Sequence, residues 1–394
     1  MPDLNRTKKI IYALAGLAIL AVLFYLAYRY FAPKLLPTPA TQGGVTGRLP
    51  GFFGTGELGA KPAPEELKPG ESLAVSPEQK LSRITDFPVV SPSFSKDEKK
   101  VLYYKKAGGD LFSSDLDGKN QEKISNITIV GLIGALWSPL RDRTAVFYLD
   151  QETLKGFLHI GTSSVATLPP DIKSFSWSPD GKSLAYTLFK DDRLNLVIAD
   201  ASGRNQKTVF STPLREAALS WITGEKIAFA TAPSGLAEGF IFTFSRSSGA
   251  FQRIAGPFFG LTSLWSPDGS RVLTASTDAA GKNLELLVRD SSGKNLLSLG
   301  ARTLPQKCAW NTSTEIYCAI PQAIAPNALW PDDYLRGEIN TLDRLARLDL
   351  EKKEFTEVFA EGTFDVSDLR LSKDGNHLIF VDRRDGTLWS LKIR

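Results

Sequence analysis

The chain has 394 residues, of which 42% are hydrophobic and 23% are charged. This composition excludes a disordered or collagen-like chain and allows a sizeable buried core. The formal net charge is only +4, and the charged residues are interspersed, so the concentrated basic face of a nucleic-acid-binding protein is not expected.

The first predicted element is a membrane span. Ile10 to Tyr28 contains no charged residue and, at about 1.5 Å per residue, covers most of a hydrocarbon layer about 30 Å thick. We predict a cytoplasmic tail over residues 1–9 and an uncleaved signal anchor over residues 10–31. The alternative is a cleaved signal peptide, but its apolar region would be only about 7 to 15 residues long.

The orientation of this span follows from the basic residues around it. Arg6, Lys8 and Lys9 precede the span, whereas Arg29 and Lys34 follow it, which keeps the tail in the cytoplasm. The sequence therefore predicts a single-pass protein of the cytoplasmic membrane, held there by residues 10–31, with its bulk on the extracytoplasmic side.

Residues 32–78 are rich in proline, glycine and alanine and show neither strand nor helix periodicity. Such a segment is typical of a flexible linker. Within it, the apolar stretch Leu49-Pro50-Gly51-Phe52-Phe53-Gly54 is open to two interpretations: an incidental aromatic pair, or a short docking segment.

Residues 79–394 contain a repeat. Trp-Ser-Pro-Asp-Gly occurs at Trp177 and again at Trp265, and looser copies recur about every 40 to 45 residues, at Phe94, Trp137, Trp221 and Trp310. Leu371 closes the series after a longer step. Proline, aspartate and glycine at these positions suit a tight turn between two strands. A repeat of this length with a tryptophan signature predicts the four-stranded blade of an all-β propeller.

Seven repeats indicate a seven-bladed β-propeller, but the last repeat lacks its outer strand. Lys80 to Thr85 resembles an outer strand of the repeat and lies just before the first blade. We predict that this N-terminal strand closes the last blade and removes an exposed sheet edge.

The repeats resemble those of the TolB-type β-propeller family, in which a Trp-Ser-Pro-Asp-Gly turn also leads into a strand like Ser183-Leu184-Ala185-Tyr186-Thr187. The resemblance covers roughly residues 79 to 394 and implies a WD-like propeller of the cell envelope. This chain differs from TolB itself in its retained membrane span, its linker in place of an α/β domain, and its seven repeats where TolB has six.

We expect no catalytic site, metal or cofactor. The Gly-x-Ser-x-Gly pentapeptide of a serine hydrolase does not occur, and the two histidines, His159 and His377, fall in different blades. Asp115 to Asn120 is weakly similar to a calcium loop but lacks its terminal glutamate, so a plain hairpin is favoured.

Cys308 and Cys318 flank the turn of the sixth repeat, where a hairpin would place them opposite each other. Outside the cytoplasm such a pair is favoured to form a disulfide. Two buried free thiols are the alternative.

One loop departs from the repeat. The step from Trp310 to Leu371 is longer than the others, and the additional residues lie around Gln322 to Thr341, between the second and third strands of the sixth repeat. We predict a protein-binding loop there, because exposed residues of these types are enriched at interfaces. Its candidate residues are Trp330, Asp332, Asp333, Tyr334 and Arg336. The alternative is a lid that packs on its own blade.

The favoured function is therefore a membrane-tethered extracytoplasmic propeller that binds a protein partner as a scaffold in a cell envelope. Two alternatives remain open: a structural subunit of a larger envelope machine, and a ligand-binding or hydrolytic propeller that uses its central channel. An apolar surface at the channel mouth would favour the scaffold, whereas a ring of carboxylates would favour the ligand-binding protein.

Overall fold

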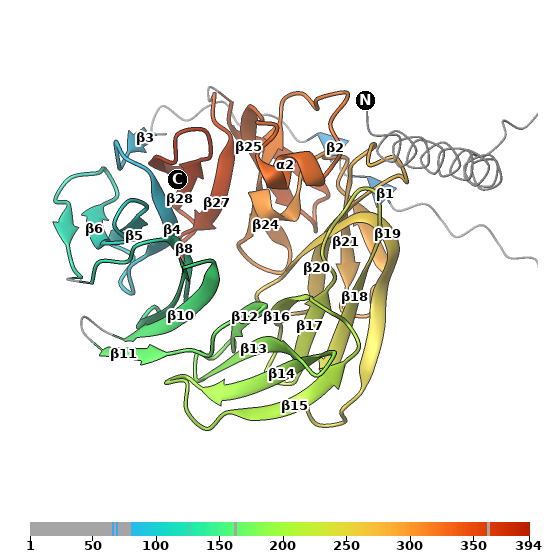
Figure 1. Ribbon diagram of the computed structural model, residues 1–394. Coiled ribbons are helices and arrows are strands. Elements are labelled where there is room, and N and C mark those ends of the chain that lie inside the picture. Colours follow the sequence, from blue (N-terminus) through green and yellow to red (C-terminus); the bar gives the residue numbers. More distant parts are fainter. Residues whose placement is uncertain (1–64, 67, 70–79, 126, 161–163, 361–362) are drawn as a thin grey trace, which may run out of the picture. The chain divides into compact units, whose positions relative to one another are not determined.

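The computed structural model describes residues 65–66, 68–69 and 80–394, except 126, 161–163 and 361–362 (Figure 1). Residues 62–394 form one compact unit. The predicted tail and span of residues 1–31, and most of the predicted linker, lie outside the described residues. Within the described ranges, no helix is both long and apolar enough to cross a membrane.

The described chain is almost entirely β-structure, and its strands pair mainly with their sequence neighbours. Three four-stranded antiparallel sheets come first. They are β4 (Val89–Phe94), β5 (Lys100–Lys105), β6 (Leu111–Asp115) and β7 (Glu122–Lys123); β8 (Leu132–Trp137), β9 (Arg143–Asp150), β10 (Thr153–Ile160) and β11 (Ser164–Thr167); and β12 (Ser174–Trp177), β13 (Ser183–Lys190), β14 (Arg193–Asp200) and β15 (Lys207–Thr212).

An eight-stranded sheet follows and contains the long strand β19 (Phe251–Trp265). Its other strands are β16 (Ala218–Trp221), β17 (Lys226–Ala230), β18 (Glu238–Ser245), β20 (Arg271–Thr277), β21 (Glu285–Asp290), β22 (Asn295–Ser298) and the short β1 (Glu65–Glu66). The next sheet contains β23 (Cys308–Trp310), β24 (Glu315–Pro321), β25 (Asp343–Asp349), β26 (Glu354–Phe359) and the short β2 (Lys68–Pro69).

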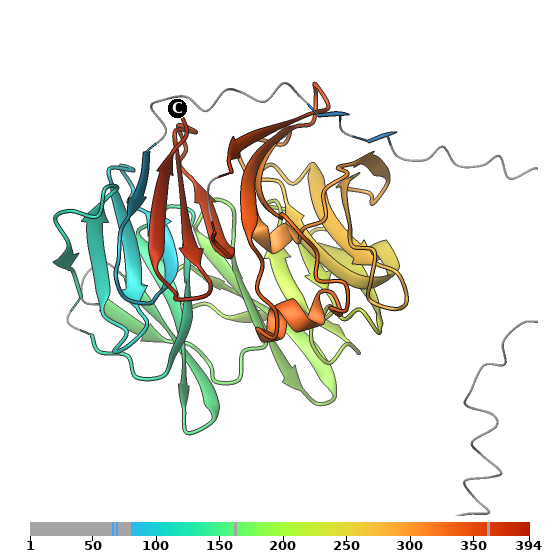
Figure 2. The same ribbon diagram turned by 90° about the horizontal axis from the view of Figure 1, so that it is seen from above.

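The last sheet joins the two ends of this unit. It contains β27 (Val366–Leu371), β28 (His377–Asp382), β29 (Leu388–Lys392) and, at its outer edge, β3 (Lys80–Arg83), which pairs antiparallel with β29 (Figure 2). The predicted closing strand is therefore confirmed. β28 also contacts β4, so the last sheet lies beside the first and the succession of sheets is closed.

The hydrophobic core lies between successive sheets rather than within one sandwich. One cluster, for example, joins Leu158 of the second sheet to Phe175 and Leu184 of the third, and another joins Tyr317 of β24 to Leu378 and Leu391 of the last sheet. This packing of successive sheets against one another is typical of a β-propeller.

The repeated turn works as the sequence predicts. In the third sheet, Ser178 Oγ lies 2.6 Å from Asp180 Oδ1 and accepts the backbone N–H of Ser183 at 2.9 Å. Gly181 has φ +68°, a conformation that side chains with a Cβ rarely adopt. The turn therefore fixes the register of the hairpin β12–β13.

The signature tryptophans also connect neighbouring sheets. Trp137 Nε1 donates to the carbonyl of Ser91 in β4, and Trp177 Nε1 donates to the carbonyl of Leu136 in β8, each at 2.8 Å. Trp310 Nε1 makes the equivalent bond to Leu264 at 3.2 Å. The first two bonds join the first strand of a sheet to the first strand of the preceding sheet, and the third joins β23 to β19 of the eight-stranded sheet.

Candidate functional site

The loop that departs from the repeat carries a short helix, α2 (Asp332–Arg336), which ends at Gly337 with φ +81°. Trp330 and Tyr334 are 1% and 4% exposed, and their rings stack with centroids 5.7 Å apart. The expectation that these two aromatic residues are exposed is therefore wrong. Their apolar area is already buried within the chain.

The loop is buried because it packs across loops of the eight-stranded sheet. Trp330 N donates to the carbonyl of Gly281 at 2.9 Å, and the N–H of Gly235 donates to Asp332 Oδ2 at 2.6 Å. A Cβ at Gly235 would collide with the backbone carbonyl of Trp330, and one at Gly281, where φ is +67°, would meet the Leu329 side chain. These two glycines are the sequence signal for the close approach, which the repeat pattern alone did not reveal.

The remaining candidates of the loop have different surroundings. Asp333 accepts the backbone N–H of Leu329 at 2.7 Å and pairs with Arg336 at 2.7 Å. Arg336 also pairs with Glu338, and its side chain is 53% exposed. The structure thus gives Asp332 and Asp333 positions that stabilise the loop and leaves Arg336 on the surface. A role of these residues in partner binding stays a prediction.

A buried ionic cluster, which sequence reasoning missed, contacts the loop through Tyr334 and Thr341. Lys307 Nζ lies 2.8 Å from carboxylate oxygens of both Asp343 and Asp365. It also donates to Tyr334 Oη and Thr341 Oγ1, each at 2.9 Å. The three charged side chains are 0 to 1% exposed. We call these five residues the Lys307 cluster.

Burial and charge compete in this cluster. Burial alone would lower the pKa of Lys307, but the two carboxylates outweigh it and hold the pKa above its ordinary value. Burial raises the pKa of Asp343, whereas the pKa of Asp365 is lowered because Lys307, Thr341 and Tyr334 all donate to it against the effect of burial. Burial raises the pKa of Tyr334 to about 12. The cluster joins Tyr334 of α2 to Asp365, the residue before β27 of the last sheet.

Cys308 and Cys318 lie directly opposite each other in the antiparallel pair β23–β24. The structure joins them in a disulfide with a Cα–Cα distance of 4.0 Å. They are the only cysteines of the chain.

For this disulfide we expect that denaturation in an alkylating reagent without reductant leaves both cysteines unlabelled in intact-mass analysis. After reduction both should be labelled, and the free energy of unfolding should fall by about 2 to 3 kcal/mol because a small loop is opened. Labelling of both cysteines before reduction would instead establish two free thiols.

An apolar cavity of about 410 Å³ lies among the innermost strands. Its lining includes Ser91 of β4, Ile133 and Leu136 of β8, Phe175 of β12, and the charged residues Asp368 and Arg370 of β27. Apolar side chains thus dominate the lining, and Asp368 is the single carboxylate among the described lining residues.

Ile133 and Leu136 of this lining are two of five large exposed hydrophobic residues in or beside the second sheet. Large hydrophobic side chains are exposed there by 41 to 79%, namely those of Val130, Ile133, Leu136, Leu140 and Leu149. The β8–β9 register shifts between Leu132 and Gly134, which leaves Ile133 as an extra, unpaired residue of a bulge. We call these five residues the blade-two patch. The Trp-centred repeat pattern did not single them out, because such residues also suit a buried strand.

The described residues contain no group of three or more histidine, cysteine, aspartate or glutamate side chains that is suited to a metal ion. His159 is 3% exposed and lies in β10, with Nδ1 3.4 Å from Tyr104 Oη. His377 begins β28, and burial lowers its pKa. The structure does not bring the two histidines together in one sheet.

Comparisons with known proteins give a likeness of fold. No family model and no curated protein matches the sequence. Among solved structures, oligogalacturonate lyase from Vibrio parahaemolyticus matches with a TM-score of 0.58 and 11% identity, over 80% of this chain and 93% of the lyase. The β-propeller domain of the Trilobed protease from Pyrococcus furiosus matches with a TM-score of 0.53 and 14% identity, over 78% and 93%.

The tricorn protease matches with a TM-score of 0.51 and 13% identity over 81% of this chain, which spans 34% of that longer protein. Structures described as TolB also match, with TM-scores of 0.43 and 0.40. At these identities the comparisons show the β-propeller fold. The narrower assignment to the TolB-type family stays a prediction.

Proposed function

We propose that this chain is a membrane-tethered scaffold, without enzymatic activity, whose propeller binds a protein partner on the extracytoplasmic side of the cytoplasmic membrane. The observation that carries the proposal is the blade-two patch beside the apolar cavity. An exposed apolar surface of this kind favours a protein interface, because the side chains lose contact with water only when a partner covers them.

The tether in this proposal rests on the sequence, and the blade count rests on the sequence repeats together with the strand pairing. The tether and its orientation follow from the uncharged stretch Ile10 to Tyr28 and the basic residues before it. The count of seven blades is supported by β19, whose first part pairs with β18 and whose last part pairs with β20. We therefore read the eight-stranded sheet as two blades that share this strand.

The apolar lining of the cavity supports the scaffold over a channel that binds a ligand through carboxylates. The lyase and proteases among the structural neighbours share the fold at 11 to 14% identity, and fold alone does not transfer an activity.

The test is partner capture by the full-length protein in its native membranes, by chemical crosslinking and mass spectrometry. We expect Ile133→Asp with Leu136→Asp to reduce the captured partner about tenfold or more, because buried charge opposes association. The matched control is Leu236→Asp with Leu342→Asp, which changes two other exposed leucines, 65% and 47% exposed. Equal capture by wild type and the Ile133/Leu136 variant would reject the blade-two patch as the interface.

A further inference from the structure

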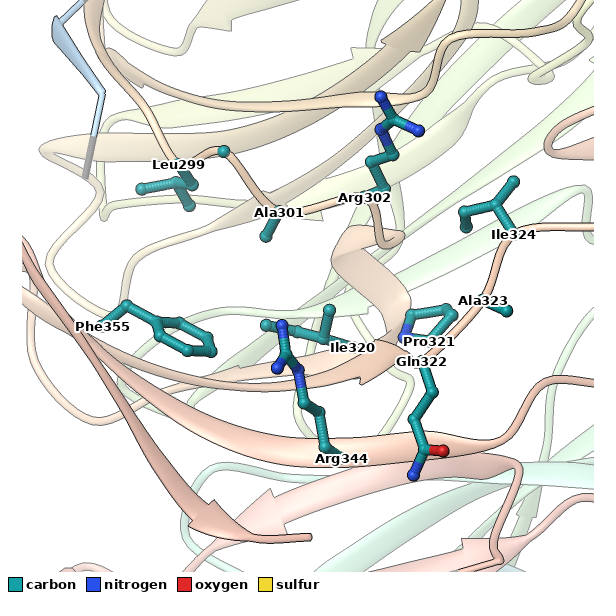
Figure 3. A pocket seen from close by; sticks show the side chains of 11 residues that line it. Leu299, Ala301, Arg302, Ile320, Pro321, Gln322, Ala323, Ile324, Arg344 and Phe355 are labelled. Carbon is teal, nitrogen blue, oxygen red and sulfur yellow. The ribbon is translucent and has the colours of Figure 1, made fainter. Parts of the chain in front are cut away.

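A groove of about 590 Å³ lies between the eight-stranded sheet and the sheet that contains β23 to β26 (Figure 3). Leu299, which follows β22, lines it from one sheet, and Ile320 of β24 and Phe355 of β26 line it from the other. Sites for small molecules typically have volumes of about 300 to 1,000 Å³ and apolar side chains in their walls. The groove has both properties.

The charged groups of this groove are all cations. Among the described residues that line it, Arg302 and Arg344 are the two charged ones, and none is an aspartate or a glutamate. Two arginines beside apolar walls favour an anionic ligand that also carries an apolar body.

Arg344 is the cation that reaches into the groove. Figure 3 shows its side chain extending from β25 toward the segment that carries Leu299, whereas Arg302 is directed away. The Arg344 guanidinium lies 5.1 Å from the centroid of the Phe355 ring. Its one side-chain hydrogen bond among the described residues joins Nη1 to Glu357 Oε2 at the long distance of 3.5 Å. Since the side chain is 41% exposed, donors of the guanidinium remain available to a carboxylate.

The backbone around the groove favours a small molecule over a peptide that adds as a strand. Ser298, next to Leu299, is paired with a residue of β1, and Phe355 is paired with a residue of β2. The strand edges that border the groove are therefore already used at these positions. A ligand that binds through side chains alone needs no free edge.

We propose that this groove binds a small organic acid. Its carboxylate pairs with the Arg344 guanidinium, and its apolar body, aromatic or branched, lies against Phe355, Ile320 and Leu299. The ion pair selects the charge of the ligand, and the apolar walls select the body attached to it. The groove is a different surface from the blade-two patch, and the proposal does not depend on the protein partner proposed there.

The first test is photolabelling of the full-length protein with 4-benzoylbenzoate, which carries a carboxylate on an aromatic body that reacts with nearby C–H bonds on irradiation. The matched control is 4-benzoylbenzamide, which has the same body without the charge. We expect the acid to label the peptides that carry Leu299, Ile320 or Phe355 about tenfold more than the amide does, as measured by mass spectrometry. Equal labelling by both probes, or no labelling of these peptides, would overturn the proposal.

The second test removes the cation. Arg344→Gln should lower labelling of the groove by 4-benzoylbenzoate about tenfold, because the ion pair is lost while a polar side chain of similar length remains. Arg193→Gln is the matched control, since Arg193 also lies at the start of the third strand of its sheet and is exposed.

The third test fills the groove and keeps its charge. Ala323 is an exposed residue of the lining, so Ala323→Trp places an indole in the groove without replacing a core side chain. It should lower labelling by the acid to the level of Arg344→Gln. Thermal unfolding of each variant is measured alongside, and if Arg344→Gln loses its fold, Ala323→Trp decides. A folded variant of either kind that is labelled as strongly as Arg193→Gln would refute the organic-acid site.

Discussion

Replacing Lys307 by methionine is expected to lower the free energy of unfolding by about 3 to 5 kcal/mol, because it leaves the buried carboxylates of Asp343 and Asp365 without their shared cation. The measurement is equilibrium unfolding in denaturant at neutral pH. Lys207→Met is the control, since Lys207 is an exposed lysine on the outer strand β15. A loss of equal size in both variants would contradict the assigned role of the cluster.

The pH dependence of the free energy of unfolding should also distinguish the wild type from the Lys307→Met variant. In the wild type, the lowered pKa of Asp365 gives stability that is present above its ordinary pKa of about 3.9 and is lost on acidification below it. The raised pKa of Lys307 gives stability that is present below about pH 10.4 and is lost as the pH rises through the folded value.

Without the lysine, the two buried carboxylates repel each other, so their pKa values in the folded state should lie above those of the unfolded chain. The folded variant then binds more protons than the unfolded one and should become more stable as the pH falls from 7 toward 5. The variant in which Asp343→Asn and Asp365→Asn accompany Lys307→Met should recover part of the lost stability. A variant whose stability is independent of pH in this range would contradict the buried charges.

Replacing Trp330 by alanine is expected to destabilise the protein by about 3 to 5 kcal/mol, because a fully buried indole leaves a large cavity. Hydrogen exchange at Gly235 should accelerate as well, since its N–H donates to Asp332 in the neighbouring helix α2. Arg336→Ala, at a mostly exposed side chain of the same helix, should change the stability by less than about 1 kcal/mol.

This result would distinguish the two interpretations of the loop. A tryptophan that acted only as a contact for a partner would leave the stability of the free protein unchanged after truncation, and partner capture would fall instead. Because Trp330 is buried in the free protein, we expect the opposite result, a reduced stability that is measured without any partner.

The fold could be predicted from the sequence because its signals are local. Trp177 and the turn at Ser178 to Gly181 mark a hairpin within a few residues, and repetition of that pattern fixes the blade boundaries. The closing strand could also be found, because Lys80 to Arg83 resembles the outer strands and the last repeat is one strand short.

The site could be predicted only in part, because its contacts join distant residues. The position of the additional loop followed from the spacing, but its burial depends on Gly235 and Gly281 of other loops. In the sequence Lys307 is indistinguishable from a surface lysine, and its partners Asp343 and Asp365 lie much later in the chain. A single sequence carries no signal that brings these charges together.

The position of β3 has a mechanical consequence. It is the strand that completes the last blade, and on its N-terminal side the chain continues to β2 and β1, which add to two other blades. A pulling force on the N-terminal end of the chain therefore meets the short parallel strands first and the four register pairs of β3 with β29 next. Detachment of β1 and β2 would release additional chain before force reaches the β3–β29 pairing. These two strands would therefore delay the mechanical opening of the last sheet.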